Sequence, residues 1–220
     1  MPTELRIPAE VDIAEFISKE AHDLKSPFNR ILGFIKLVLR GMDGSIPDQA
    51  RDDLSTAHQN SLYAIALMGG LVEMSRISRG EKDVTPVGCQ VDDLLRQVAS
   101  DWKRQYSKSF PAEVILSVPA CRIPADEIVF RQCLSNWISY VVEFVQETAL
   151  VNIQVEEQPS TYLFTIRSSG KRVANPPACD LTIYGYIAQK TLELHRGVLL
   201  RLEAEAQGAL VQFSWPKENL

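Results

Sequence analysis

Residues 16–28 read FISKEAHDLKSPF, and this stretch decides how the N-terminal part of the chain is interpreted. It places His22 next to Asp23 in a segment whose apolar residues recur every three or four positions. The same periodicity extends from residue 11 to about residue 40 and is typical of one long amphipathic helix. The pattern predicts an exposed imidazole whose neighbouring carboxylate leaves one ring nitrogen free to attack.

A second helix is predicted after a short turn. Residues 41–47 contain two glycines and a proline, and Asp48 suits the first turn of a new helix. An apolar stripe then continues to about residue 78, where Arg76, Arg79 and Gly80 suit a helix C-terminus. Two such helices form a hairpin too thin to close its own core. The stripe suits either an intramolecular bundle or a bundle made by two chains.

The pattern changes to mixed helices and strands after residue 83, which predicts two domains, residues 1–82 and residues 83–220. The second domain is expected to be an α/β sandwich, so that the fold class of the whole chain is α+β. We expect helices at 91–107, 126–147 and 181–194, a loop at 168–177, and strands at 114–118, 150–155, 162–167, 198–204 and 209–215.

Bulk properties exclude several classes of function. A net charge of −5 and a pI of about 5.3 argue against nucleic-acid binding, which favours a basic face. The four cysteines are irregularly spaced, with no pair or nearby histidine at metal-ligand spacing, so no metal site is predicted. No apolar run approaches the length of a bilayer helix, and the expectation is a cytoplasmic protein without membrane contact.

The stretch around His22 resembles the phosphoacceptor box of two-component histidine kinases. The matching positions are an apolar stripe, then Ser18, His22, Asp23, Leu24, Lys25, Ser26 and Pro27. Compared with the family pattern, Lys19 to Ala21 are additional residues between the serine and the histidine. The resemblance implies a dimeric four-helix bundle built from two hairpins, with phosphate carried on His22. It also implies that Asp23 polarises the imidazole, that Ser26 orients a water, and that Pro27 kinks the helix.

The second domain resembles the ATP-binding domain of the same kinases. Three stretches carry this resemblance: PAD at 124–126 followed by FRQCLSNW at 130–137, LELHRG at 192–197, and the final hairpin from Gln207 to Pro216. Asn136 and Gly170 are then remnants of a nucleotide site. The chain departs from the family at several nucleotide contacts: Tyr140 for the second Asn, Glu143 for Lys, Ser168 for the adenine-binding Asp, and one glycine, Gly185, in place of a glycine-rich box.

These departures predict that ATP and Mg²⁺ binding is lost, since phosphoryl transfer from ATP depends on metal and phosphate contacts. The chain then resembles kinase-derived histidine phosphotransferases, in which a partner receiver domain supplies the metal. Besides a second copy of the chain, the implied partners are a response-regulator receiver domain and possible sensor kinases. The receiver is expected to dock on side chains that equally suit the bundle core: Phe28, Ile31, Ile35, Leu67, Leu71 and Met74.

Two alternatives remain open. In one, the protein is a dimeric adaptor that binds a response regulator or a kinase and carries no phosphate. In the other, it is an atypical active kinase with unusual nucleotide contacts. Of the other histidines, His58 is interpreted as a surface residue and His195 as part of the packing of a turn.

Overall fold

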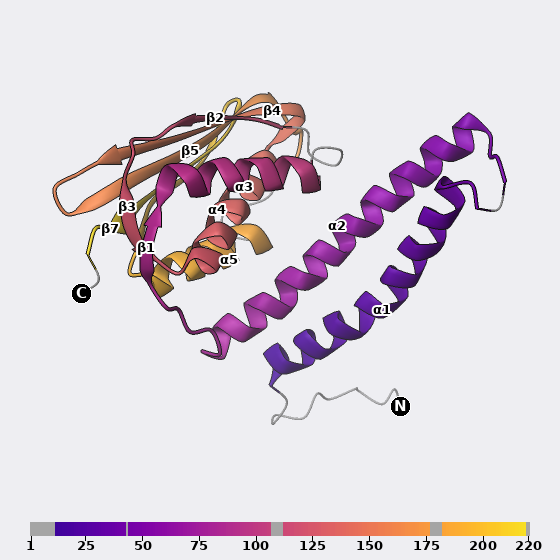
Figure 1. The fold of residues 1–220 in the computed structure, drawn as a ribbon, viewed down its shortest axis with the longest axis horizontal. Coiled ribbons are helices and arrows are strands. Elements are labelled where there is room, and N and C mark those ends of the chain that lie inside the picture. The colour runs from indigo at the N-terminus through magenta and orange to yellow at the C-terminus, as the bar shows by residue number, and fades with distance from the viewer. Residues whose placement is uncertain (1–11, 43, 107–111, 177–181, 219–220) are drawn as a thin grey trace, which may run out of the picture. The chain divides into compact units, whose positions relative to one another are not determined.

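A computed structural model describes residues 12–42, 44–106, 112–176 and 182–218. The chain divides into two compact units, residues 1–82 and residues 83–220 (Figure 1). The first is helical and the second combines helices with two sheets, which confirms the predicted α+β class.

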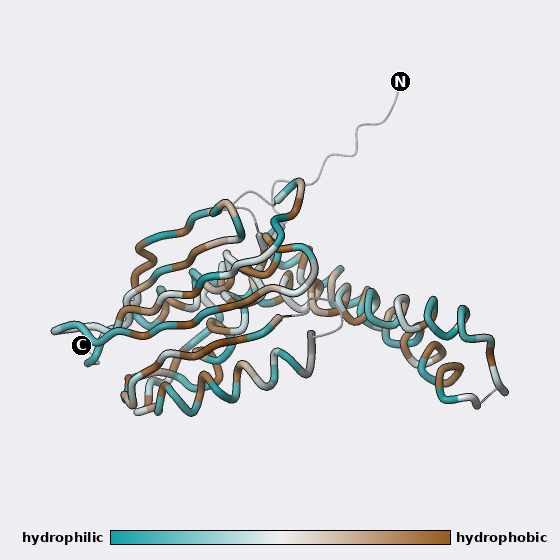
Figure 2. Tube along the Cα trace, turned by 90° about the horizontal axis from the view of Figure 1, so that it is seen from above, coloured by the Kyte–Doolittle hydropathy of each residue, from teal (hydrophilic) through white to brown (hydrophobic). Residues whose placement is uncertain are grey.

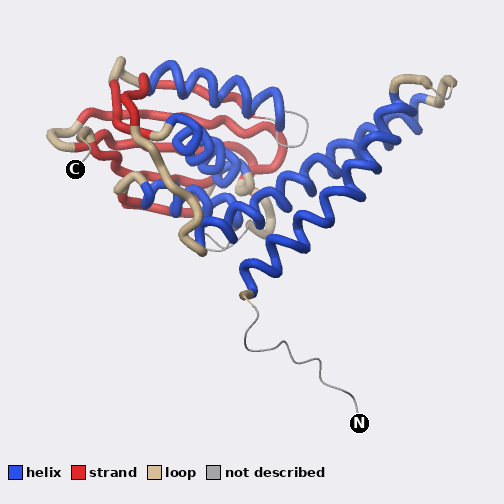
Figure 3. The backbone as a smooth tube through the Cα atoms, turned by 60° about the horizontal axis from the view of Figure 1, so that its bottom comes forward, coloured by secondary structure: helices blue, strands red, loops and turns tan. Residues whose placement is uncertain are grey.

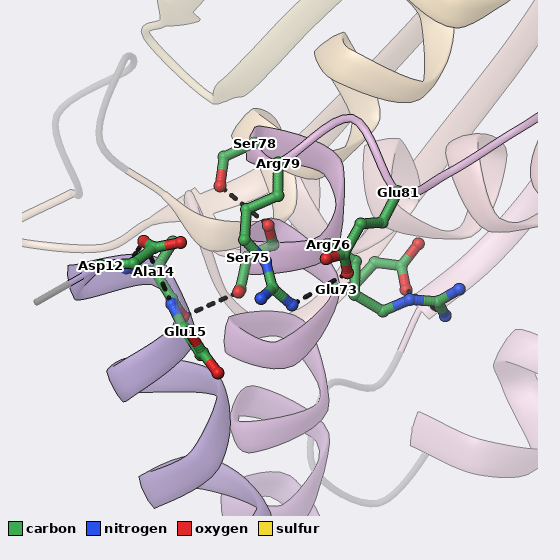
Figure 4. A network of polar contacts seen from close by, with 9 residues as sticks. All are labelled: Asp12, Ala14, Glu15, Glu73, Ser75, Arg76, Ser78, Arg79 and Glu81. Carbon is green, nitrogen blue, oxygen red and sulfur yellow. Dashed lines mark hydrogen bonds and ion pairs between the residues drawn. The ribbon is translucent and has the colours of Figure 1, made fainter.

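The first unit is a hairpin of two long helices, α1 (Ile13–Leu39) and α2 (Asp48–Ser78). The carboxylate of Asp12 caps α1 by accepting hydrogen bonds from the backbone N–H groups of Ala14 and Glu15 (Figure 4). The helices lie side by side, and the residues buried most deeply on α2 recur at intervals of seven: Ser61, Met68 and Ser75. This spacing is that of a coiled-coil seam.

The second unit contains two sheets. A two-stranded antiparallel sheet pairs β1 (Val87–Gln90) with β3 (Arg122–Ala125). A five-stranded sheet has the order β2-β4-β5-β7-β6, in which β2 runs parallel to β4 and the other pairs are antiparallel. Its strands are β2 (Ala112–Ser117), β4 (Val145–Glu157), β5 (Thr161–Arg172), β6 (Val198–Glu205) and β7 (Gly208–Pro216).

Three helices pack on one face of the larger sheet (Figures 1 and 3): α3 (Val91–Tyr106), α4 (Glu127–Val142) and α5 (Ile183–Leu194). Apolar and polar residues alternate along the strands (Figure 2), so that one face of the sheet is apolar. On β5 the buried members of this alternation include Phe164 and Ile166. The core between sheet and helices is aromatic, with Phe130 of α4 in edge contact with both Phe164 and Trp215.

The structure corrects several predicted boundaries. The helix predicted at 126–147 ends at Val142, and from Val145 the chain belongs to β4. The run VVEFV at 141–145 is rich in β-branched and aromatic residues, which favours the change to strand. Residues 168–172, predicted as a loop, extend β5. The small β1/β3 sheet was not predicted, because its four-residue strands contain Gly88 and Pro124.

Candidate functional site

His22 lies on the outer surface of α1. Its side chain is 80% exposed, whereas the preceding residue, Ala21, is only 2% exposed and lies in the interior of the hairpin. Neighbouring helix positions point about 100° apart, so one residue serves the packing and the next projects into solvent. The imidazole is therefore exposed to solvent on the hairpin.

Asp23 lies close enough to bias the tautomer of His22. The Nδ1 atom of His22 is 3.3 Å from Oδ1 of Asp23, and Asp23 is itself exposed. When Nδ1–H donates to this carboxylate, Nε2 keeps its lone pair and points away from Asp23. At 3.3 Å between exposed groups the contact is weak, so it orients the ring without locking it.

Ser26 follows His22 by four residues on α1 and therefore lies on the same face of the helix. It is exposed. Pro27, inside the helix, has no N–H, so the carbonyl of Asp23 lacks the usual helical donor four residues later. The carbonyl of Asp23 and the hydroxyl of Ser26 thus lie within about one turn of the imidazole along α1.

The predicted partner surface is only partly accessible. Ile35 is 9% exposed and counts as core, so the prediction that it contacts a receiver is wrong. It lies fourteen residues after Ala21, which places both on the buried side of α1. Ile31 is 46% exposed, and the remaining members of the set are half-buried, so their contact with a receiver stays a prediction: Phe28, Leu67, Leu71 and Met74.

Sequence reasoning missed two exposed apolar residues on α1. Phe34 is 70% exposed and Leu37 is 44% exposed. Leu37 lies fifteen residues after His22, about 60° from it around the helix and about 22 Å along it. The helical wheel contained this signal, because Leu37 falls outside the stripe that includes Ala21 and Ile35.

An exposed apolar strip lies on the opposite side of α1 from His22. It includes Leu24, which is 51% exposed, and Ile31, seven residues later. Both positions are about 160–180° around the helix from His22. An isolated hairpin thus exposes an apolar strip of the kind that commonly marks a protein interface, and covering that strip leaves the imidazole accessible.

Two residues are expected from the resemblance to be remnants of a nucleotide site. The contacts explain one of them, Gly170, and not the other, Asn136. Gly170 is required by packing, since a Cβ there would lie 2.5 Å from Cγ1 of Val145. Its N–H donates to the carbonyl of Gln207 at 2.8 Å. Asn136 is half-buried on α4, and nothing in the structure explains the choice of asparagine.

Ser168 stands where the resemblance places the adenine-binding Asp. Its side chain is buried, and its hydroxyl donates to the carbonyl of Val141 at 2.6 Å while accepting from the N–H of Ala209 at 3.0 Å. A Cβ on Gly208 would lie 2.3 Å from the Ser168 carbonyl oxygen, so this region is tightly closed. The hydroxyl joins α4 to β7 and is already engaged within the protein.

Tyr140 stands where the resemblance places the magnesium-binding Asn. Its side chain is fully buried, and its ring packs against Phe144 with 5.2 Å between ring centroids. The ring also approaches Gly185 so closely that a Cβ there would lie 3.1 Å from the Cδ2 atom of Tyr140. At the same point Thr182 caps α5 by accepting from the N–H of Gly185 at 3.0 Å. The helix N-terminus that normally faces phosphate is thus capped from within.

Glu143 replaces a lysine of the resemblance and is largely buried at the C-terminal end of α4. Within the part of the chain that the structure describes, its Oε2 atom has no hydrogen-bond partner. Burial raises the pKa of this carboxyl to about 7. Where the family places a cation, this chain has an acid that is partly ionised near neutral pH.

The described part of the chain contains no group of three or more His, Cys, Asp or Glu residues arranged to hold a metal. It also contains no helix that is both long and apolar enough to cross a bilayer.

No protein-family model matches the chain. Among curated proteins, it is 24% identical over 163 residues to an uncharacterized sensor-like histidine kinase of Rhizobium meliloti, covering 72% of this chain and 31% of the relative. It is 26% identical over 227 residues to the non-motile and phage-resistance protein of Caulobacter vibrioides, covering 92% of this chain and 27% of the relative. The chain thus spans about a third or less of these relatives.

Among solved structures, the histidine kinase AdeS of Acinetobacter baumannii aligns with a TM-score of 0.62 at 13% identity, covering 90% of this chain and 98% of that chain. Full-length ShkA in complex with AMPPNP aligns with a TM-score of 0.64 at 19% identity, covering 92% of this chain and 46% of that chain. The chain therefore has a histidine-kinase-like core, in which a helical hairpin precedes an ATPase-like α/β domain.

Proposed function

We propose that this protein is a histidine phosphotransferase of a two-component system, in which His22 exchanges phosphate with the aspartate of a receiver domain. In the forward step, Nε2 of His22 attacks the phosphorus of the phospho-aspartate. The bond from phosphorus to the carboxylate oxygen breaks, and the receiver's aspartate leaves as a carboxylate. The receiver supplies the metal.

The observation that carries this proposal is the placement of His22. Its side chain is 80% exposed beside Asp23, on the face of α1 opposite the apolar strip of Leu24 and Ile31. Two hairpins that bury the strip against each other form a homodimeric four-helix bundle with both imidazoles outside. A receiver then has access to either one.

We further propose that the second unit does not use ATP. Tyr140, Ser168 and Thr182 are engaged within the protein at the positions where the family contacts nucleotide. The ionised carboxylate of Glu143 would repel a triphosphate that a lysine attracts. Phosphate must then come from a partner.

The receiver is proposed to dock along the face of α1 that begins at His22 and continues through Ser26 to Leu37, with Phe34 at its border. Leu37 and Phe34 supply exposed apolar area about 20 Å from the imidazole, within the width of a small domain. Ile31 is assigned to the dimer interface in this arrangement, and Leu67, Leu71 and Met74 remain candidates for either surface.

The test is phosphate transfer from a labelled donor. A receiver domain carrying radioactive phospho-aspartate is incubated with the purified protein, and label on the protein is followed by gel autoradiography. We expect transfer that His22→Ala abolishes and that His58→Ala, a change at a second histidine of the same unit, leaves intact. Transfer that survives His22→Ala would exclude this site.

The adaptor alternative gives a different result in the same assay. An adaptor binds the receiver but takes no label, and its affinity is unchanged by His22→Ala. Measuring receiver binding by isothermal titration calorimetry beside the transfer assay therefore separates the two functions.

A further inference from the structure

His195 is buried at a junction of several segments of the second unit. It follows α5 directly as its C-terminal cap, and its side chain is among the buried polar groups. The ring packs on Trp215 of β7 with 4.8 Å between ring centroids. Trp215 in turn donates from Nε1 to the carbonyl of Pro124 at 3.0 Å.

The hydrogen bonds of His195 fix its protonation state. Nε2 accepts from the backbone N–H of Asp126 at 3.0 Å, so this nitrogen carries no proton. Nδ1 lies 3.0 Å from the carbonyl of Thr191, which requires a proton on Nδ1. The ring is therefore neutral, and only one of its two neutral tautomers satisfies both contacts.

Asp126 connects this ring to the segment that leads into the second unit. Its Oδ2 atom accepts from the N–H of Thr85 at 3.1 Å, and its Oδ1 atom accepts from the N–H of Val129 at 3.1 Å. Partial burial alone raises the pKa of this carboxyl, but backbone hydrogen bonds, from Ile128 as well, and the nearby His195 ring when it is protonated together lower the pKa. Asp126 thus holds both residue 85 and the first turn of α4, while its own N–H is held by His195.

A cavity of about 360 Å³ borders the imidazole. It is lined by Val84, Pro86, Pro124, Leu194, His195, Arg196, Pro216 and Glu218. The cavity gives the ring room to turn and gives protons a route to it. Among the described residues, the ionisable groups near His195 include the carboxylate of Asp126, the adjacent Arg196, and Glu218 on the cavity wall.

We propose that His195, Asp126 and Thr85 form a protonation-sensitive clasp, which is closed when the imidazole is neutral and opens when it is protonated. Protonation places a hydrogen on Nε2 directly opposite the N–H of Asp126, and two donors do not bond. The ring then turns toward the cavity, where the carboxylates of Asp126 and Glu218 attract it and Arg196 opposes it. Asp126 loses its backbone anchor, and Thr85 is released from α4.

The clasp acts where the chain enters the second unit, two residues after the boundary at residues 82 and 83. Its opening lengthens the free connection between the phosphoacceptor hairpin and the ATPase-like domain. A fall in pH therefore frees the segment around Thr85, whether or not His22 carries phosphate.

The test follows amide hydrogen exchange by NMR in the full chain from about pH 8 to about pH 5, a range in which histidine titrates and the carboxyl of Asp126, whose pKa is lowered, stays ionised. After correction for the intrinsic pH dependence, we expect exchange at Thr85, Asp126 and Val129 to rise about tenfold, as for a local opening. The matched variant is His195→Gln, whose carbonyl accepts from Asp126 but does not titrate. It should remove the rise.

A second measurement, made on the wild-type protein, keeps the proposal testable if the His195→Gln variant misfolds. The ¹⁵N shifts of the wild-type His195 ring report directly whether Nε2 gains a proton in the same pH range. Protonation of Nε2 together with faster exchange supports the clasp. Unchanged exchange at the three amides, or an equal rise in a folded His195→Gln variant, overturns it.

Discussion

Ser75 on α2 donates a hydrogen bond from its hydroxyl to the carbonyl of Ala14 on α1 at 2.7 Å (Figure 4). The two residues are 61 positions apart, and the bond joins the last turn of α2 to the first turn of α1. Ser75 is only 3% exposed. The base of the hairpin is thus fixed by a specific polar contact in addition to apolar packing.

Replacing Ser75 with Ala should destabilise the hairpin by about 1 kcal/mol, because one buried hydrogen bond is lost. Ser78 is the matched control, since it is exposed and its hydroxyl donates to the nearby carbonyl of Ser75 on the same helix. Ser78→Ala should change stability by less than about 0.5 kcal/mol. Urea unfolding followed by circular dichroism at 222 nm measures both, and equal effects would contradict the role of Ser75.

Two substitutions on α1 should separate the dimer from receiver docking. Ile31 and Leu37 are 46% and 44% exposed, but they lie about 120° apart around the helix. Ile31→Glu places a charge in the proposed dimer interface and should halve the mass measured by light scattering. Leu37→Glu should keep the dimer and weaken receiver binding about tenfold or more, as for an interface residue worth at least 1.4 kcal/mol.

The opposite result would mean that the dimer interface and the receiver-docking surface are the reverse of those proposed. A monomeric Leu37→Glu protein, together with a dimeric Ile31→Glu protein that fails to bind the receiver, would place the dimer interface on the side of His22. The proposed arrangement of the bundle would then be wrong.

The helical hairpin followed from the sequence because its signals are local. Apolar periodicity, the turn at residues 41–47 and the exposed position of His22 all depend on spacing along one helix. The strand ends did not follow, because pairing across the sheet decides them. Residues 145–147 were predicted as the end of a helix, yet the β4/β5 ladder includes Val145 and Gln146 before a bulge.

The surface of the candidate site was harder to predict than its centre. Ile35 and Phe34 are adjacent apolar residues, and composition gives no reason to prefer either as surface. One is 9% exposed and the other 70% exposed, because the orientation of α1 against α2 decides which is buried. Likewise, the sequence showed that nucleotide contacts had changed, but not that Tyr140 and Ser168 are fully engaged in the core.

ATP with magnesium should not bind in a saturable manner. Isothermal titration calorimetry up to about 1 mM nucleotide, the upper end of common enzyme affinities, should give no binding isotherm. The physical reason is that Tyr140 and Thr182 occupy or cap the positions where the family contacts phosphate and metal. A saturable isotherm that Tyr140→Trp abolishes would instead support the atypical kinase.

Replacing Glu143 with Gln should stabilise the protein at alkaline pH and leave it nearly unchanged in acid. The pKa of this carboxyl is raised from 4.5 to about 7, so the folded state binds a proton more tightly than the unfolded state does. Wild-type stability therefore falls as pH rises from 4.5 to 7 and stays lower above that range, whereas glutamine does not titrate.

The expected gain for Glu143→Gln is roughly 3 kcal/mol at pH 8, and it should shrink toward zero near pH 4.5. Urea unfolding at a series of pH values measures the difference between the two proteins. Glu113, an exposed acid on β2, provides the control, because Glu113→Gln should shift stability little and with no step near pH 7. A constant gain for Glu143→Gln across the whole pH range would mean that burial does not raise the pKa of the Glu143 carboxyl. The electrostatic argument against triphosphate binding would then lose its main support.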